Sequence, residues 1–549
     1  MDREELKPYV SLTPTRQESS LIDQFYFYLT VTKPSDALYI SYSMSDEMGE
    51  GKSPSSYLSS LYRIFPALQP VTGEQTVKEE GAVSVRMALR LLAEGMDEYR
   101  EGRESEAWRR LYGCLYEKKE NRAVLRRMAD MAFAVYGGDC ISRAAARALY
   151  GEPLKGSVTR LERYAVCAYA QFLSYGLELT RRKEFEFAAL DMGNVFHKGL
   201  ELCFRKAEES GISLADLDEG KRKGLVEDAM AQAAESLGNN VLKSSARNEY
   251  LFHRMGRIME KTVWALGEQL KAGRFEPVAF ELTFSPGENE AMRISLAGEG
   301  QMQLKGKIDR VDLYEDEDHV YVKIIDYKSG GMDFDLTGVY YGLQLQLVVY
   351  LDAVMRREQR KHPDKEIVPA GMFYYQIQDP ILERDAAGSD PEDAVLSALR
   401  PKGIFNGEDQ VTALFQKETP RDGASRWIPA VMKDGKPVRG KSSQASREQF
   451  AHMRNFVIRR MQEFGTAIAR GDISARPYKR KDQTGCDYCE FRSVCGFDRK
   501  LPGYEYRRLK EPSPEEIWTE MARTDQPGTL RKAGERNGSG VDGRTEKDH

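Results

Sequence analysis

Two short segments joined by an acidic turn constrain the fold more than any other part of the sequence. The first is Gly306–Asp312 (Gly-Lys-Ile-Asp-Arg-Val-Asp) and the second is Ile325–Gly330 (Ile-Asp-Tyr-Lys-Ser-Gly). The acidic run Glu315–Asp318 between them suits a tight connection. We therefore expect the two segments to be the strands of a β-hairpin.

The charged residues of this hairpin are expected to converge. Side chains alternate between the two faces of a strand, so Asp326 and Lys328 point the same way, and Asp309 on the neighbouring strand can lie beside them. Carboxylates are the ligands that Mg²⁺ prefers, and a metal with a lysine can promote phosphodiester cleavage. The alternative is an exposed hairpin with ordinary salt bridges, and these residues alone do not decide between the two.

A polar pair follows the lysine strand. Gln346 and Tyr350 are four positions apart on an expected helix, so they share one face of it. This helix can place the pair over the carboxylates. The alternative is a buried glutamine and tyrosine that are satisfied within the core.

Two more residues are candidates on weaker grounds. Glu281 lies in a strand-like run in which Phe280, Leu282 and Phe284 are expected to share one face, with Glu281 on the other. His197 falls on an expected amphipathic helix. A lone histidine in such a helix is more often a surface or core residue than a ligand.

Three of the seven cysteines are closely spaced, namely Cys486, Cys489 and Cys495. Three thiolates need a fourth ligand, for which Cys167 is the best candidate, and it would tie the start of a domain to its end. Four thiolates suit either zinc or an iron–sulfur cluster. A single CxxC with a third and a remote fourth cysteine fits zinc less well than paired CxxC motifs. The remaining cysteines are expected to pack as small hydrophobic residues in helices: Cys114, Cys140 and Cys203.

The chain has 549 residues, too many for one core, and the usual domain length suggests roughly three or four domains. Apolar periodicity predicts a helical connector, then mixed α and β structure, and the last part is too poor in apolar residues to fold. The expected divisions are residues 1–65, the connector 66–154, the α/β part 155–500, and a largely disordered extension 501–549.

The spacing of apolar residues also predicts the individual elements. Helices are expected at 57–65, 83–99, 107–116, 121–136, 158–176, 191–209, 223–272, 336–356 and 446–470. Strands are expected at 38–42, 277–285, 303–314, 320–328 and 368–378.

Charge and targeting signals place further bounds on function. The net charge is −5, so the chain lacks the excess of lysine and arginine that a wholly phosphate-binding surface would show. DNA contact would then use local basic grooves or a partner's surface. The start of the chain has no apolar signal region, and no apolar run approaches the ~18 residues that span a bilayer. We expect a cytoplasmic protein without a membrane partner, in which cysteines bind metal more often than they form disulfides.

The order of the candidate residues resembles the RecB-type PD-(D/E)XK nucleases that carry an iron–sulfur staple. The resemblance covers about residues 155–500 and is closer still to the B subunits of AddAB-type helicase–nucleases. The segments that carry this closer likeness are Arg160 to Cys167, Tyr175 to Leu179, Asp191 to His197 and Arg476 to Lys479.

The resemblance implies a nuclease core in which a mixed sheet is flanked by helices. It implies a 4Fe-4S cluster on Cys167, Cys486, Cys489 and Cys495, and Mg²⁺-dependent cleavage with His197, Glu281, Asp309, Asp326, Lys328, Gln346 and Tyr350 as the catalytic set. Of these, the implied metal ligands are Asp309, Asp326, His197 and Glu281. It further implies processing of double-strand DNA ends and single strands for recombinational repair, in a heterodimer with an AddA-like helicase–nuclease subunit.

The beginning of the chain favours part of a helicase–nuclease complex over a free-standing nuclease. Residues 28–42 resemble the last motif of superfamily 1 helicases and its following strand, with Lys33 where active helicases have arginine. Lysine cannot reproduce the planar bidentate clamp on phosphate, so residues 1–65 are expected to be the remnant of an inactivated helicase-like domain. Gly49–Ser53 is not a P-loop, because the first glycine of that motif would fall on Asp46. The chain is therefore not expected to bind ATP by itself.

The chain departs from these AddAB-type relatives in length. They are about twice as long, so the sequence resembles a C-terminal piece of one. Two alternatives are a stand-alone Cas4-like nuclease with the same core and a non-catalytic, DNA-clamping scaffold with a zinc staple. The helicase-like start and helical connector argue against the first, and the set of Asp309, Asp326 and Lys328 argues against the second.

Overall fold

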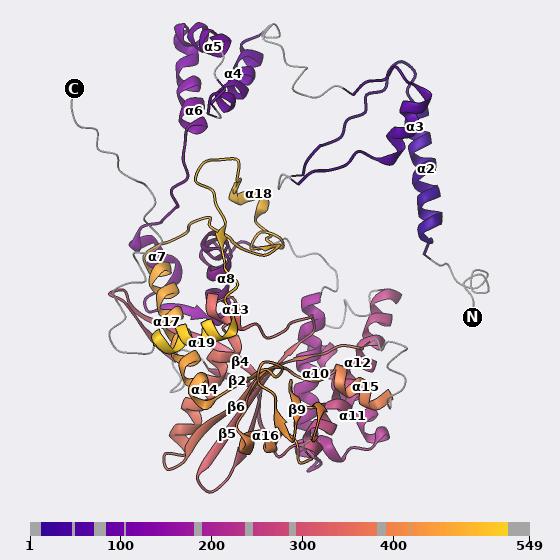
Figure 1. Cartoon of the computed structure of the whole chain (residues 1–549), viewed down its shortest axis with the longest axis vertical. Coiled ribbons are helices and arrows are strands. Elements are labelled where there is room, and N and C mark those ends of the chain that lie inside the picture. The colour runs from indigo at the N-terminus through magenta and orange to yellow at the C-terminus, as the bar shows by residue number, and fades with distance from the viewer. Residues whose placement is uncertain are drawn as a thin grey trace. The chain divides into compact units, whose positions relative to one another are not determined.

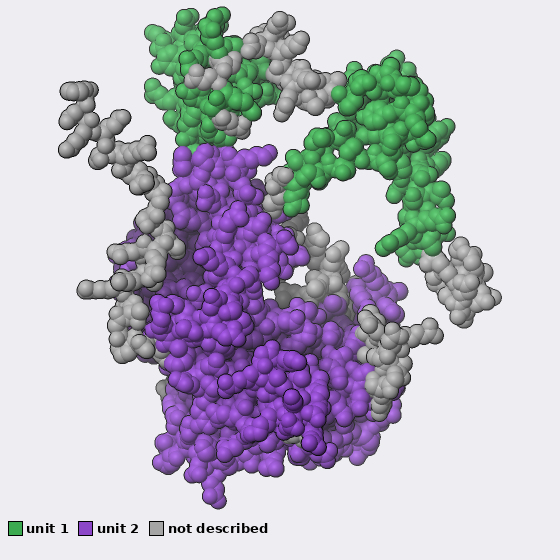
Figure 2. Space-filling view, in the orientation of Figure 1, with its two compact units in different colours: residues 1–134 green, residues 135–549 purple. Residues whose placement is uncertain are grey.

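The computed structural model divides into two compact units, residues 1–134 and residues 135–549 (Figure 2). The residues that the structure describes are 13–46, 50–70, 84–100, 102–103, 106–180, 189–236, 245–284, 292–380, 391–418 and 420–524. The expected disordered tail over residues 525–549 and Gly49 of the rejected P-loop lie outside these ranges.

The described part of the first unit is helical. Its helices are α2 (Arg16–Thr32), α3 (Ser56–Ile64), α4 (Val85–Arg100), α5 (Glu106–Glu117) and α6 (Arg122–Ala132), which confirms the four helices expected between residues 57 and 136. Helices α4 to α6 share a small core around Leu92, Leu115 and Leu125. Trp108 packs directly on Gly95, where a Cβ would lie 2.3 Å from the indole ring.

The strand expected at residues 38–42 is wrong. The structure gives these residues no regular secondary structure, and Tyr39 is 93% exposed. A run of β-forming residues becomes a strand only when another strand accepts its backbone hydrogen bonds. In the described part of this unit no other strand is present to do so.

The second unit is built on a mixed sheet. Its path runs β1-β4-β5-β6-β7-β11, and β2 and β3 also pair with β4. Strands β1 and β4 are parallel, as are β5 and β6, while β2 and β3 run antiparallel to β4, and β4 runs antiparallel to β5. The strands are β1 (Leu154–Ser157), β2 (Glu276–Phe284), β3 (Met292–Leu296), β4 (Gly300–Glu315), β5 (His319–Lys328), β6 (Glu366–Gln376), β7 (Lys402–Asn406) and β11 (Gln444–Ala445).

Helices cover this sheet on both faces (Figure 1). One face packs against α8 (Val158–Val166), α14 (Gln346–Lys361), α17 (Arg447–Ala469) and α19 (Pro514–Thr524) through a core that includes Val322 and Ile324. The other packs against α10 (Ala189–Glu209), α11 (Glu219–Ser236) and α12 (Ala246–Ala272) through Ile325 and Tyr327. The alternation along β5 thus sends consecutive side chains into different cores, and the expected α/β fold with a mixed sheet between helices is confirmed.

The remaining elements of this unit are shorter. The helices are α7 (Arg143–Tyr150), α9 (Ala168–Gln171), α13 (Leu336–Tyr341), α15 (Pro391–Ala398), α16 (Asp409–Phe415) and α18 (Arg492–Cys495). The strands are β8 (Gly423–Ala424), β9 (Val431–Lys433), β10 (Lys436–Pro437), β12 (Tyr478–Arg480), β13 (Gln483–Thr484) and β14 (Arg507–Arg508).

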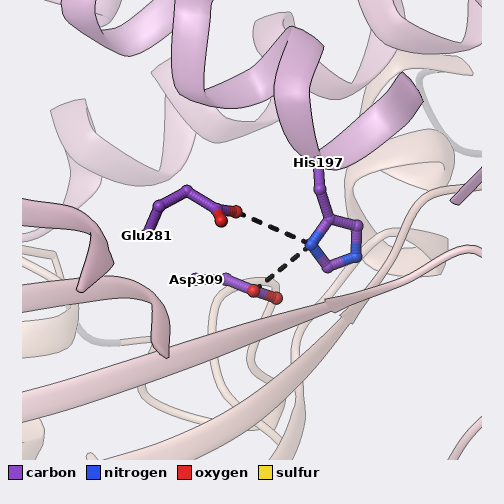
Figure 3. A group of neighbouring side chains, drawn as sticks. All are labelled: His197, Glu281 and Asp309. Atoms are coloured by element: carbon purple, nitrogen blue, oxygen red, sulfur yellow. Dashed lines mark ion pairs between the residues drawn. The ribbon is translucent and has the colours of Figure 1, made fainter. Parts of the chain in front are cut away.

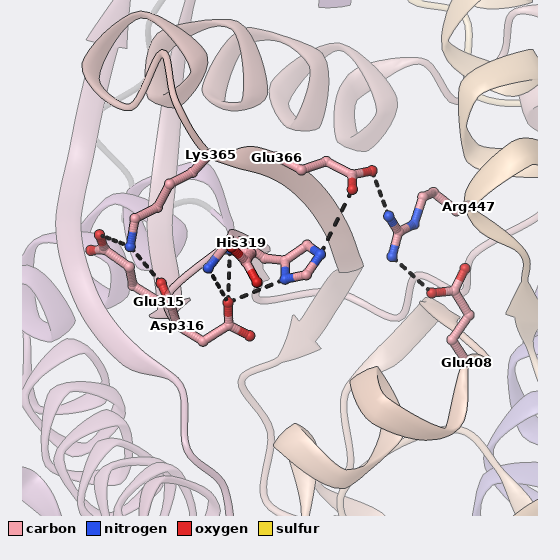
Figure 4. Close-up of polar contacts among 8 residues, drawn as sticks. Glu315, Asp316, His319, Lys365, Glu366, Glu408 and Arg447 are labelled. Carbon is pink, nitrogen blue, oxygen red and sulfur yellow. Dashed lines mark hydrogen bonds and ion pairs between the residues drawn. The ribbon is translucent and has the colours of Figure 1, made fainter.

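The expected hairpin of β4 and β5 is confirmed, and its acidic turn has a clear physical basis. The side chain of Asp316 accepts hydrogen bonds from the backbone N–H groups of Asp318 at 3.0 Å and His319 at 2.7 Å, which closes the turn. Charged side chains then connect the hairpin to its neighbours (Figure 4), with Lys365 2.9 Å from Glu315 and His319 Nε2 3.7 Å from a carboxylate oxygen of Glu366. Such partly exposed pairs contribute little to stability, so the turn depends mainly on Asp316.

Several expected helix boundaries need correction. The helix expected at 223–272 is two helices, α11 and α12, with residues 237–244 between them outside the described ranges. The helix expected at 158–176 is interrupted at Cys167, which has an extended backbone with φ −167°. Residues 501–524, part of the extension expected to be largely disordered, contain β14 and α19, and Ile517 and Met521 of α19 belong to the main core.

The isolated cysteines are only partly as expected. Cys203 is fully buried, which confirms its packing role. The expectation is wrong for Cys114 and Cys140, both of which are exposed. Cys140 also lies outside any helix, in a segment that forms an isolated β-bridge with Asp472. Among the described residues, no helix is both long and apolar enough to cross a membrane.

Candidate metal centre

A cavity of about 740 Å³ opens at the end of the β4–β5 hairpin nearest α10 and α14. It is lined by backbone and side chains from α10, β2, β4, β5 and α14. All seven residues proposed from the sequence line it: His197, Glu281, Asp309, Asp326, Lys328, Gln346 and Tyr350.

Three of them form a compact group of ligand atoms (Figure 3). The ligand atoms of His197, Glu281 and Asp309 all lie within 4.8 Å of one another. His197 Nδ1 is 3.2 Å from Asp309 Oδ1 and 3.9 Å from Glu281 Oε1. The second oxygen of Asp309 accepts a hydrogen bond from the Tyr327 N–H at 2.7 Å, so this carboxylate is held by β5 as well as by its own strand.

Glu281 reaches the group through an unusual backbone. Its φ is +52°, in the left-handed region that a side chain other than glycine seldom adopts. The expected sharing of one face by Phe280, Leu282 and Phe284 is therefore wrong. Phe280 stacks on Phe204 in the α10 core, with ring centroids 4.4 Å apart, whereas Leu282 and Phe284 pack in the opposite core. The change of face occurs at Glu281.

Asp326 and Lys328 form the second part of the site. The Lys328 ammonium lies 2.5 Å from Asp326 Oδ2, and it donates to Gln346 Oε1 at 3.0 Å. The amide of Gln346 donates in turn to Asp326 Oδ1 at 2.9 Å and to the Tyr350 hydroxyl at 3.1 Å. Gln346 thus holds both the carboxylate and the lysine in one orientation. Asp326 lies in the same cavity as the His197 group but is not part of its compact set of ligand atoms.

Burial sets the electrostatics of these residues. Asp326 is 2% exposed, and burial, together with the charge of Asp309, raises its pKa from 3.8 to about 6. Burial by itself would lower the pKa of His197, but the hydrogen bond with Asp309 and the nearby carboxylates raise it above its ordinary value. In both residues, neighbouring carboxylates contribute to the rise in pKa, and a bound cation would oppose that contribution.

Two lysines without an assigned role from the sequence also line the cavity. Lys198 pairs with Glu201 at 2.7 Å, and Lys307, directly before Ile308, forms an ion pair with Glu281. Lys307 was visible in the sequence as part of the hairpin, but its pairing with Glu281 depends on the contact between β2 and β4.

An acidic hydrogen-bond acceptor beside the cavity was also missed. Glu162 of α8 accepts hydrogen bonds from the backbone N–H groups of Leu345 at 2.6 Å and Gln346 at 3.0 Å. Burial raises the pKa of Glu162 to about 7, against the opposing effects of these two N–H groups and of Lys328. Its position close to Cys167 in the sequence carried no signal for this contact.

The four cysteines proposed as ligands lie around one small cavity. It is lined by Cys167, Cys486, Cys489 and Cys495 together with apolar and aromatic neighbours. Gly485 allows the loop to approach α8, because a Cβ there would lie 3.0 Å from the Val166 carbonyl oxygen. Burial raises the pKa of the Cys167 thiol, and burial raises that of Cys486 to about 11, with the other three sulfurs adding to the effect.

The fold and the site together define the class of protein. A family described as the PD-(D/E)XK nuclease superfamily matches residues 155–496, more than half of the chain. The chain therefore belongs to the PD-(D/E)XK nuclease superfamily.

Three curated relatives are each named as the B subunit of an ATP-dependent helicase/deoxyribonuclease. The one from Lachnoclostridium phytofermentans is 36% identical over 526 residues, which cover 94% of this chain and 44% of the relative. Those from Clostridium kluyveri and Caldanaerobacter subterraneus subsp. tengcongensis are 31% and 33% identical, over 94% and 95% of this chain and 46% and 45% of the relative. The chain thus spans less than half the length of these relatives.

Proposed function

We propose that this chain is the nuclease-bearing part of a helicase–nuclease complex of the AddAB type, a Mg²⁺-dependent DNA exonuclease that processes double-strand breaks for recombinational repair. The names of the relatives support this assignment. The observation that carries it is the convergence of His197, Glu281, Asp309, Asp326 and Lys328 in one cavity.

The compact group fits a divalent cation. The two carboxylates offer the hard oxygen ligands that Mg²⁺ and Mn²⁺ prefer, and the imidazole, within 4.8 Å of them, offers a borderline nitrogen ligand; Glu281, Asp309 and His197 would together hold the ion. Asp326 adds a buried charge beside them. When bound, such an ion neutralises charge on the scissile phosphate and makes a bound water more acidic.

The protein's own groups would then position the reaction. Lys328, fixed between Asp326 and Gln346, can orient the attacking water and offset the charge that develops on the phosphate oxygens. Lys198 and Lys307 line the same cavity and would attract the DNA backbone. This local basic lining reconciles DNA binding with a net charge of −5.

We also propose that the four cysteines hold a 4Fe-4S cluster. Cys167, Cys486, Cys489 and Cys495 line one small cavity, which supports their binding one group together. A single CxxC with a third and a remote fourth cysteine fits zinc less well than paired CxxC motifs, which favours the cluster over a single zinc ion. Its binding would release the protons of these thiols.

The remaining parts of the proposal follow from the relatives. An AddA-like helicase–nuclease subunit would be the partner in a heterodimer, and double-strand ends and single strands of DNA in the cytoplasm would be the substrates. ATP dependence would come from the rest of the complex, because residues 49–53 do not form a P-loop.

A nuclease assay with the full chain tests the proposal. Wild type, Asp326→Ala and Lys328→Ala are compared on linear duplex and single-stranded DNA in Mg²⁺. Either substitution should lower the cleavage rate at least about 100-fold, the usual cost of losing a group that stabilises the transition state. EDTA should abolish cleavage by the wild type, and Mg²⁺ or Mn²⁺ should restore it.

Matched controls come from charged residues outside the cavity. Asp409→Ala on α16 and Lys365→Ala each remove a charge from a surface pair and should leave the rate unchanged. Cleavage by Asp326→Ala or Lys328→Ala within a few-fold of wild type would remove these residues from the reaction.

A further inference from the structure

Helix α8 connects the cysteine group to the candidate metal centre. Cys167 directly follows its last residue, and Glu162, five positions earlier, directs its carboxylate to the first turn of α14. The helix itself is firmly placed. Leu161 is fully buried, the Tyr164 hydroxyl donates to Asp472 Oδ2 at 2.5 Å, and the Arg163 guanidinium lies 5.9 Å from the Phe491 ring centre.

Helix α14 lacks a cap of its own. The first N–H groups of a helix need acceptors, which serine, threonine, aspartate or asparagine usually provides at the N-cap position. Leu345 occupies that position in α14, and no side chain of its own segment caps the helix. One oxygen of Glu162 instead accepts from the N–H groups of both Leu345 and Gln346, and its charge also suits the positive end of the helix.

The capped residue is the one that organises the site. Gln346 is the first residue of α14, and its side chain contacts both Lys328 and Asp326. Its backbone is held by Glu162 while its amide holds the lysine and the carboxylate. Glu162 is not among the residues that line the cavity, so it has no direct access to a substrate there.

We propose that Glu162 is a positioning residue of the nuclease: by capping α14 it fixes the Gln346 amide, and through it Lys328 and Asp326. The proposal rests on the proposed function of these residues in DNA cleavage. A shift of the first turn of α14 would move the amide relative to both partners. A displacement of about 1 Å in a reacting group can cost about 100-fold in rate.

Glu162→Ala and Glu162→Gln test the role in the full chain, with cleavage of single-stranded DNA in Mg²⁺ as the assay. Glu162→Ala should lower kcat about 100-fold with little change in KM, because the misplaced groups act on the transition state. Glu162→Gln keeps an oxygen that can accept both N–H groups and should recover most of the rate. Thr159→Ala, an exposed position on the same helix, should behave as wild type.

A double variant separates positioning from a general loss of stability. If Glu162 acts through Gln346, the variant with both Glu162→Ala and Gln346→Ala should be no slower than Gln346→Ala alone. If the double variant were slower than wild type by the product of the two single-variant losses, the residues would act independently and the proposal would be overturned. A rate for Glu162→Ala within about threefold of wild type would overturn it as well.

Hydrogen exchange gives a second readout that does not depend on cleavage. The backbone amides of residues 345 and 346 should exchange faster in Glu162→Ala than in wild type or Thr159→Ala. Unchanged exchange at these amides would overturn the capping role. If wild type and Thr159→Ala both fail to cleave DNA, the proposed function is at fault, and the exchange result still decides whether Glu162 caps α14.

Discussion

At the scale of single residues, the site gathers buried carboxylates whose charge Lys307, Lys328 and His197 offset only in part. Asp309 and Asp326 are 6% and 2% exposed, and both lie close to His197 in one cavity. Burying a carboxylate costs free energy, and burial together with the charge of Asp309 raises the pKa of Asp326 to about 6 even though Lys328 lies 2.5 Å from it. A cation bound beside these carboxylates would offset that cost.

The stability of the metal-free protein should therefore depend on Asp326 in a defined pH range. Because its pKa rises from 3.8 to about 6 on folding, its contribution to stability is fully present below about pH 4 and is lost as the pH rises through 6. Asp326→Asn is uncharged at every pH. In EDTA at pH 8 it should be more stable than wild type by about 3 kcal/mol, since one pKa unit corresponds to about 1.4 kcal/mol. Urea unfolding at pH 4.5 and pH 8 measures the difference, which should shrink at the lower pH.

Asp352→Asn is the matched control for this measurement. Asp352 is also 2% exposed, but it is paired with two arginines, Arg356 at 2.7 Å and Arg454 at 2.5 Å, whereas Asp326 is paired with one lysine and lies near the like charge of Asp309. Its substitution leaves two arginine groups without their partner and should destabilise the protein at pH 8. A loss of stability in Asp326→Asn at pH 8 would contradict the assigned cost of burial.

At the scale of elements, strand β2 shows how the backbone serves the site. A regular strand would send Phe280, Leu282 and Phe284 to one face, yet Phe280 packs in one core and the other two in the opposite one. The left-handed backbone at Glu281 makes this change of face and brings its carboxylate to the ligand group. A non-glycine residue in this conformation costs about 1–2 kcal/mol, and such strain is often retained at functional sites.

Glycine should therefore be the better-tolerated substitution at position 281. In an ordinary strand, glycine is less stable than alanine by about 0.5–1 kcal/mol. At Glu281 the order should reverse, with Glu281→Gly more stable than Glu281→Ala by about 1 kcal/mol, because glycine adopts a positive φ without strain. The measurement is the urea midpoint of each variant without metal.

Thr283 provides the comparison within the same strand, as it is exposed and is not among the residues with positive φ. Thr283→Gly should be less stable than Thr283→Ala. If glycine is also the worse substitution at position 281, the backbone there is not strained as described.

At the scale of the whole molecule, contacts distant in sequence close the second unit. The segment that begins it is bonded to its C-terminal part: the N–H of Tyr136 donates to the Pro502 carbonyl at 2.9 Å, and that of Ile141 to Gly471 at 2.9 Å. Tyr136 also stacks on Tyr504, with ring centroids 4.2 Å apart. The four cysteines link the same two parts of the unit, because Cys167 and the triplet Cys486, Cys489 and Cys495 line one cavity. A cluster bound by all four would join these parts through iron–sulfur bonds.

Loss of Cys167 should therefore weaken the fold as well as the cluster. Cross-linking segments a few hundred residues apart stabilises a fold by about 5 kcal/mol, by analogy with disulfides. Cys167→Ala should lose the broad absorbance expected at about 400 nm for thiolate-bound iron, and the second unit should become sensitive to protease. It should also bind DNA more weakly, although Cys167 does not line the metal cavity.

Cys203→Ala is the control, because this fully buried cysteine lies in the α10 core away from the other sulfurs, and its loss should be mild. Metal analysis after anaerobic purification identifies the bound species. Zinc without iron would refute the 4Fe-4S cluster but would still be consistent with a metal cross-link through the four cysteines. Full metal content and normal protease resistance in Cys167→Ala would exclude Cys167 as the fourth ligand.

The features that the sequence determined are local in the chain. Asp309, Asp326 and Lys328 could be placed together because they belong to one hairpin, whose alternating side chains and acidic turn are set by backbone geometry. Gln346 and Tyr350 share a face for the same kind of reason. The cysteine triplet is equally local. In each case the relative positions of the side chains depend on a few residues that are close in sequence.

Tertiary structure alone decided which distant residues join this framework. Glu281 was expected on a regular strand, and Glu162 had no predicted role. The packing of β2 against β4 brings Glu281 into the ligand group, and the packing of α8 against α14 brings Glu162 to the helix that carries Gln346. The strand expected at residues 38–42 failed for the converse reason, since no partner strand is present in the described part of its unit. Backbone periodicity is a property of a short segment, whereas a buried contact depends on which surfaces of the folded chain meet.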